Sequence, residues 1–135
     1  MKRALVVMTL LVLASGMLAG CAADTQEPVE ILDNAIHDVE RALGRYVQID
    51  PNGPAEEVRR ATDRVSSAWS TVVDAAADVD EIDISDAQAA HDALIEAVED
   101  IDDDMAAGEA YASIEEYVDA FEEQVDEVHD ALDVH

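Results

Sequence analysis

The stretch of sequence that decides the fold runs from residue 54 to residue 79 and reads PAEEVRRATDRVSSAWSTVVDAAADV. Its apolar residues recur at alternating spacings of three and four, which places them on one face of an α-helix. The residues on this face are Val58, Ala61, Val65, Ala68, Val72, Ala75 and Val79. Because Pro54 suits the first turn of a helix, we predict a helix that begins there and packs this face against other helices.

The same spacing occurs in an earlier segment, residues 27–47. Its apolar face consists of Leu32, Ile36, Val39, Leu43 and Tyr46. The pattern stops before Asp50-Pro51-Asn52-Gly53-Pro54, a combination typical of a tight turn. We therefore predict a helix over 27–47 that is joined to the next helix by a short loop.

Two later segments complete the set. Ser85 and Gln88 form a capping-box pattern, which predicts a helix from Ser85 to near Gly108. Its face consists of Ala87, His91, Leu94, Val98, Ile101 and Met105. Ser113 and Glu116 repeat the capping pattern and predict the start of a last helix. The face of that helix consists of Ile114, Val118, Phe121, Val125, Val128 and Leu132.

Four amphipathic helices with short loops favour an all-α domain over residues 28–135. We predict an up-down-up-down antiparallel four-helix bundle, with a three-helix bundle and one loose helix as the alternative.

The N-terminus has a different composition. Lys2 and Arg3 precede a stretch, 4–20, that carries no charge, which is the layout of a secretory signal peptide. The stretch is shorter than the roughly 20 residues that a transmembrane helix needs. It ends in Leu18-Ala19-Gly20-Cys21, which resembles the lipobox of bacterial lipoproteins.

The lipobox resemblance covers residues 1–21. It implies cleavage of a signal peptide, residues 1–20, between Gly20 and Cys21, and attachment of a diacylglyceryl lipid with palmitate-like acyl chains to Cys21. Residues 21–27 would then be a short lipidated tether. The resemblance also implies export and anchoring to the outer face of the cell membrane, or to the outer membrane of a Gram-negative source.

The body that follows is strongly acidic. The whole chain has a net charge of −26, which becomes −28 when Lys2 and Arg3 are removed with the signal peptide. Nucleic acid is excluded as a partner, because the chain offers no basic surface to displace phosphate counterions. Anionic headgroups also repel such a body, so membrane attachment rests on the lipid.

Every basic residue of the body is an arginine in the first predicted helix pair: Arg41, Arg45, Arg59, Arg60 and Arg64. We expect these side chains to offset the acidic residues of 99–104 at the same end of the bundle. The alternative is an arginine patch that binds an anion or an acidic partner.

Three His-Asp pairs are the repeated chemical signature: His37-Asp38, His91-Asp92 and His129-Asp130. The predicted topology places them at similar heights on three helices. Imidazoles with nearby carboxylates suit Zn²⁺, Cu²⁺ or Ni²⁺. We therefore predict a candidate metal site formed by His37, His91 and His129, with Asp33 and Asp126 as ligands or outer partners. In the alternative interpretation, His37 and His129 face water and His91 is a hydrogen-bonded core residue.

Other chemistry has little support in the sequence. The serines have no evident base and orienting partner, Cys21 is assigned to lipid, and a glycine-rich phosphate loop is lacking. The acidic turn at 78–86 could gather a weakly bound divalent cation, although a solvated turn explains it as well. We predict a non-enzymatic, membrane-anchored lipoprotein that acts as a structural or protein-interaction module of the cell envelope, without a resident cofactor. The alternative is an envelope metal-binding lipoprotein.

Overall fold

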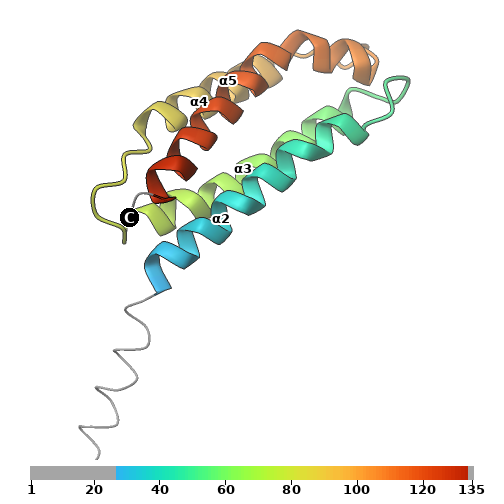
Figure 1. The fold of residues 1–135 in the computed structure, drawn as a ribbon. Helices are drawn as coiled ribbons and strands as arrows, with labels where there is room; N and C mark the ends of the chain where they lie inside the picture. The colour runs from blue at the N-terminus through green and yellow to red at the C-terminus, as the bar shows by residue number, and fades with distance from the viewer. Residues whose placement is uncertain (1–26, 134–135) are drawn as a thin grey trace, which may run out of the picture.

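The computed structural model describes residues 27–133, which form four α-helices and one short 3-10 helix (Figure 1). The elements are α2 (Glu27–Leu43), η1 (Gly44–Gln48), α3 (Glu56–Ala76), α4 (Ser85–Glu99) and α5 (Ala107–Asp133). The prediction of an all-helical chain with four helices is confirmed for these residues, and the three-helix alternative is not. The predicted signal peptide and Cys21 lie outside the described residues.

The helices associate in two pairs. Figure 1 shows α2 beside α3, and α4 beside α5. The α2–α3 and α4–α5 loops meet at one end, where Pro54 and Ala106 form an isolated antiparallel bridge. There the Ala107 N–H donates to the Gly53 carbonyl at 2.8 Å, and the Gly108 N–H donates to the Pro51 carbonyl at 3.0 Å. The two pairs are thus joined at this end through backbone hydrogen bonds.

The core is built largely from the predicted apolar faces. The residues of the first and last faces are all buried, and in α3 only Ala68 of the helical positions is half-buried. Trp69 was not on a predicted face, yet it is 2% exposed and packs edge-on against Phe121 at 5.2 Å. Between 27 and 133, no helix has the length and apolar composition needed to cross a membrane.

A buried hydroxyl pair also belongs to this core. The Tyr46 hydroxyl lies 2.6 Å from Thr62 Oγ1, and the Thr62 hydroxyl donates to the Val58 carbonyl at 2.9 Å. Burial raises the pKa of Tyr46 to about 12, so this phenol stays protonated at neutral pH. Its ring stacks on Tyr111 at 5.4 Å, which links η1 to α5.

The predicted boundaries around residue 108 were wrong. The third helix ends at Glu99, and α5 begins at Ala107 instead of Ser113. Gly108 lies in the first turn of α5, where a Cβ would come within 2.9 Å of Pro51 Cβ. Glycine is therefore needed here for close loop packing rather than as a helix stop. The Ser113 hydroxyl donates to the Ala110 carbonyl of its own helix at 2.6 Å.

The capping box predicted at Ser85 was also wrong in its partners, although α4 does begin there. Asp83 Oδ1 accepts hydrogen bonds from both the Ser85 hydroxyl at 2.6 Å and the Ser85 N–H at 2.9 Å. These bonds lower the pKa of Asp83. Gln88 instead contacts Trp69 and Asp92, so a carboxylate before the helix takes the role predicted for the serine.

Candidate metal centre

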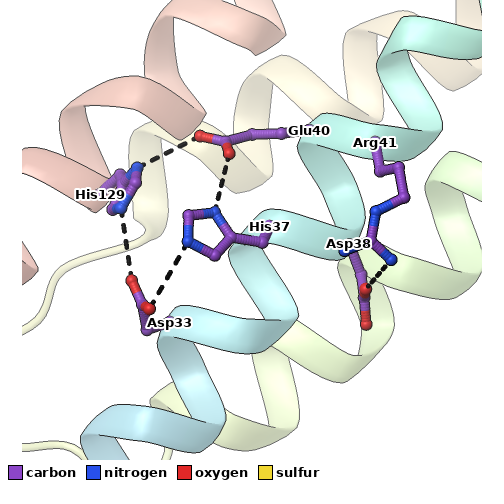
Figure 2. A network of polar contacts seen from close by, with 6 residues as sticks. All are labelled: Asp33, His37, Asp38, Glu40, Arg41 and His129. Atoms are coloured by element: carbon purple, nitrogen blue, oxygen red, sulfur yellow. Dashed lines mark hydrogen bonds and ion pairs between the residues drawn. The ribbon is translucent and has the colours of Figure 1, made fainter.

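One face of α2 presents three polar side chains to α5. Asp33, His37 and Glu40 are separated by four and three residues, so they share a face of the helix. His129 of α5 lies against this face, although it follows His37 by 92 positions in the sequence. Figure 2 shows the four side chains closing a ring.

Both carboxylates of this ring contact both imidazoles. Glu40 Oε2 lies 3.0 Å from His37 Nδ1, and its Oε1 lies 3.2 Å from His129 Nδ1. On the other side, Asp33 Oδ2 lies 3.6 Å from His37 Nε2, and its Oδ1 lies 3.3 Å from His129 Nε2. The two rings meet edge to face at 5.0 Å. Each imidazole therefore has one nitrogen toward Glu40 and the other toward Asp33.

Two neutral histidines do not carry enough protons to satisfy all the contacts in this ring. A neutral imidazole carries one N–H, so two neutral histidines supply two donors for four nitrogen–oxygen contacts. The Glu40 contacts have hydrogen-bond lengths, whereas the Asp33 contacts are longer. If both Nδ1–H groups donate to Glu40, two Nε2 lone pairs face the Asp33 carboxylate. A cation is needed between them, either a proton or a metal ion.

The electrostatics favour such a cation. The hydrogen bond to Glu40 raises the pKa of His37 above its ordinary value of 6.5, and the charge of Asp33 adds to this effect. The side chains of His37 and Asp33 are 45% and 40% exposed, and that of His129 is 26% exposed. An ion from solvent can therefore reach the Asp33 side. One ligand atom from each of Asp33, His37 and His129 lies within 4.8 Å of the others.

The other predicted ligands lie elsewhere. His91 is 9% exposed and packs against both Trp69 and Phe121, at ring distances of 6.1 and 5.5 Å. No polar contact recorded for residues 27–133 links it to the ring of Figure 2. Asp126 lines a depression between α2 and α5 but does not belong to the ligand group. Of the predicted set, the structure thus brings together Asp33, His37 and His129.

The aspartates adjacent to the histidines are not their partners on α2. Asp38 pairs with Arg41 at 3.1 Å, on a different side of the helix from His37 (Figure 2). Consecutive residues of a helix point in different directions, which explains this outcome. Glu40 was not among the predicted ligands, although it stands three residues after His37, a spacing that places both side chains on one face of the helix.

His91 does have a partner that the sequence did not indicate. Its Nε2 lies 3.0 Å from Ser66 Oγ, and its Nδ1 lies 3.8 Å from Asp92 Oδ1 and makes no hydrogen bond. Burial lowers the pKa of His91, so it is neutral at neutral pH. Ser66 stands in the middle of α3, where the backbone N–H groups are used within the helix. The Ser66–His91 contact joins α3 to α4.

The arginines only partly fulfil their predicted role. Arg59 forms an ion pair with Asp103 and donates to the Ile101 carbonyl at 2.6 Å, which ties α3 to the α4–α5 loop. Arg41 and Arg60 pair within their own helices instead.

Comparison with protein-family models, curated proteins and solved structures finds no match to this chain.

Proposed function

We propose that this protein is an exported, lipid-anchored helical protein of the cell envelope that binds a divalent transition-metal ion between α2 and α5. The ligands are His37 Nε2, His129 Nε2 and a carboxylate oxygen of Asp33. The single observation that carries the metal role is the ring of two imidazoles and two carboxylates, in which two neutral histidines supply protons for only two of the four contacts.

The separations on the Asp33 side support this assignment. Zinc–nitrogen and zinc–oxygen bonds of about 2.0–2.1 Å in tetrahedral geometry place neighbouring ligand atoms about 3.3–3.4 Å apart. His37 Nε2 lies 3.6 Å from Asp33 Oδ2 and His129 Nε2 lies 3.3 Å from Asp33 Oδ1, so each imidazole nitrogen has one carboxylate oxygen near this distance, and both contacts are long for a hydrogen bond. The three ligand atoms lie within 4.8 Å of one another, so the side chains must come closer together to bind an ion in this geometry.

Glu40 has a different role in the proposal. Metal-bound histidines usually donate their second N–H to a carboxylate, which fixes the tautomer and the orientation of the ring. Glu40 accepts from both Nδ1 atoms in this scheme, so it is an orienting residue rather than a ligand. Two imidazoles and one carboxylate favour Zn²⁺, Cu²⁺ and Ni²⁺ over Ca²⁺ and Mg²⁺. The net charge of −26 raises the local concentration of cations.

The finer architecture and the anchor belong to the same proposal. We infer an up-down-up-down antiparallel bundle, supported by the pairing of α2 with α3 and of α4 with α5 and by the Pro54–Ala106 bridge between their loops. A signal peptide at 1–20 and a lipid on Cys21 would place the bundle at a membrane surface. The chain acts there without enzymatic activity, through metal binding and contact with an envelope protein.

Isothermal titration calorimetry of the full chain in a non-ionic detergent tests the metal role. We expect one Zn²⁺ site with a dissociation constant in roughly the micromolar range. His37→Ala and His129→Ala should each abolish it. Asp33→Asn removes a ligand, whereas Glu40→Gln should weaken binding by about 10–100-fold because only orientation is lost.

Asp126→Asn is the matched control. Like Asp33→Asn it removes one negative charge, but Asp126 lies on α5 and does not belong to the ligand group. It should leave the Zn²⁺ dissociation constant nearly unchanged. Equal weakening by Asp33→Asn and Asp126→Asn would mean that bulk charge, not coordination, attracts the ion. Binding no tighter than roughly millimolar would exclude the metal site and leave a structural or protein-interaction role at the envelope.

The anchor is tested by Cys21→Ser in a bacterial host fed with a labelled fatty acid. The parent chain should carry the label and sediment with membranes, because two acyl chains hold a protein firmly. The variant should lose the label and keep its uncleaved signal. Label retained in Cys21→Ser would contradict lipidation at this residue.

A further inference from the structure

Three of the arginines surround one depression on the surface. Arg45 comes from η1, and Arg60 and Arg64 come from successive turns of α3. The depression has a volume of about 380 Å³, and its apolar lining residues are Ile49 and Ala61. This volume falls in the range of about 300–1,000 Å³ that is typical of small-molecule sites.

The charge of this depression differs from that of the rest of the molecule. Its lining contains three arginines and two carboxylates, Asp50 and Glu57. Three other depressions each contain three carboxylates and no basic residue. In a chain with a net charge of −26, this is a local region of positive charge.

The two carboxylates in the lining both lie at the α2–α3 loop. Asp50 Oδ1 accepts a hydrogen bond from the Asn52 N–H at 3.0 Å. Glu57 Oε2 lies beside Gly53, 2.6 Å from where a Cβ at that residue would stand. Asp50 therefore stabilises the turn that borders the depression, and Glu57 lies against the same turn.

The arginines are less committed. Among residues 27–133, Arg45 and Arg64 have no ion-pair partner, and Arg60 has one long contact of 3.8 Å to Glu56, outside the lining. All three side chains are exposed. Guanidinium groups bind phosphate oxygens through paired hydrogen bonds, and several around one hollow can share a multivalent anion.

We propose that this depression binds a small phosphate-bearing anion through Arg45, Arg60 and Arg64, with Gln48 as a further donor. The site lies at the end of the molecule where the α2–α3 loop stands, away from the first turn of α2 (Figure 1). It is therefore separate from the metal centre and does not depend on it. The choice of ligand rests on the proposed function: a chain anchored at Cys21 presents this end away from the membrane, so the ligand is a soluble phosphate compound.

Titration of the metal-free full chain with inorganic pyrophosphate in non-ionic detergent tests this site. We expect saturable binding, and the arginine Nε–H resonances of Arg45, Arg60 and Arg64 should shift in nuclear magnetic resonance spectra. Arg45→Gln and Arg64→Gln should each raise the dissociation constant about tenfold, since each removes charge-assisted hydrogen bonds. Arg41→Gln removes the same charge from an arginine outside the lining and should change it less than about twofold.

Binding weaker than roughly millimolar, or equal weakening by Arg41→Gln and Arg64→Gln, would overturn the proposal. A short-chain phosphatidic acid, used below its micelle concentration, separates a soluble ligand from a lipid headgroup. Affinity equal to or weaker than that of pyrophosphate supports recognition of the phosphate itself. Binding of this lipid without binding of pyrophosphate would overturn the proposal, because acyl chains would then make the contact.

Discussion

At the scale of single residues, Gly108 and Gly44 differ in whether the structure leaves room for a Cβ. Gly108 lets α5 approach the α2–α3 loop, and an added Cβ would meet Pro51 Cβ at 2.9 Å and the Pro51 carbonyl oxygen at 3.2 Å. Gly108→Ala must therefore push backbone atoms apart and strain the hydrogen bond between the two loops. We expect it to lower the free energy of unfolding by about 1–3 kcal/mol, measured by urea denaturation.

Gly44 is the control for that experiment. A Cβ there meets nothing within 4 Å, and its φ is not positive. Gly44→Ala should raise the free energy of unfolding by about 0.4–1 kcal/mol, because alanine restricts the unfolded chain. Loss of stability in both variants would show that close loop packing is not the reason for Gly108.

The candidate site illustrates what residues alone can reveal. The spacing of Asp33, His37 and Glu40 is visible in the sequence and places them on one face. Their meeting with His129 is not visible, because it depends on how α2 and α5 are rotated about their axes. His91 repeats the His-Asp signature, yet it lies on an apolar helix face and is therefore buried in the core. Adjacent residues therefore proved a poorer guide than residues three and four apart.

At the scale of elements, His91 couples the contact between α3 and α4 to pH. Burial lowers the pKa of His91, so at mildly acidic pH this side chain is protonated in the unfolded chain and neutral in the folded chain. His91 makes its full contribution to the free energy of unfolding above pH 6.5, the ordinary pKa of histidine. This contribution is lost as the pH falls through the lower pKa of the folded state. His91→Gln cannot titrate and should reduce the loss of unfolding free energy between about pH 7.5 and about pH 5.5. The fluorescence of Trp69, the single tryptophan, reports the unfolding.

His37 has the opposite sign and supplies the comparison. Because the pKa of His37 is raised in the folded state, its contribution to the free energy of unfolding is complete below pH 6.5. This contribution is lost as the pH rises through the higher pKa of the folded state. In metal-free solution, His37→Gln should therefore reduce the stability of the folded chain more at acidic than at neutral pH. Identical pH slopes in the parent and both variants would contradict these assignments.

The helices were easier to predict than their ends. The apolar spacing identified the buried faces of all four helices, since burial of one face is what such a pattern specifies. The starts at Ser85 and Ser113 were assigned to capping boxes that the structure does not contain. Many residues can supply a cap, so Asp83 could replace the predicted serine. The loop packing at Gly108 is a tertiary contact, which no local pattern encodes.

At the scale of the whole molecule, the net charge of −26 opposes folding. Ion pairs among residues 27–133 offset little of it, because the pairs of Arg41 and Arg60 are exposed and, among the arginine pairs, that of Arg59 alone joins separate elements. Raising NaCl from about 10 mM to about 1 M shortens the screening length from about 30 Å to about 3 Å. Repulsion should fall more than the few attractive pairs do, so we expect Tm to rise. A gain of about 1 kcal/mol corresponds to about 4–8 °C in a domain of this size.

Thermal melts followed by circular dichroism measure this effect, with a chelator present so that the metal centre stays empty. Glu96→Gln, Glu99→Gln and Asp100→Asn together remove three charges from one acidic depression. This triple variant should have a higher Tm than the parent at low salt and gain less from added NaCl, because part of the repulsion is already gone. A parent Tm that falls with salt would mean that attractive pairs dominate. The Asp33→Asn variant should show the same rise of Tm with NaCl as the parent, because salt screens the whole charge distribution and not one ligand.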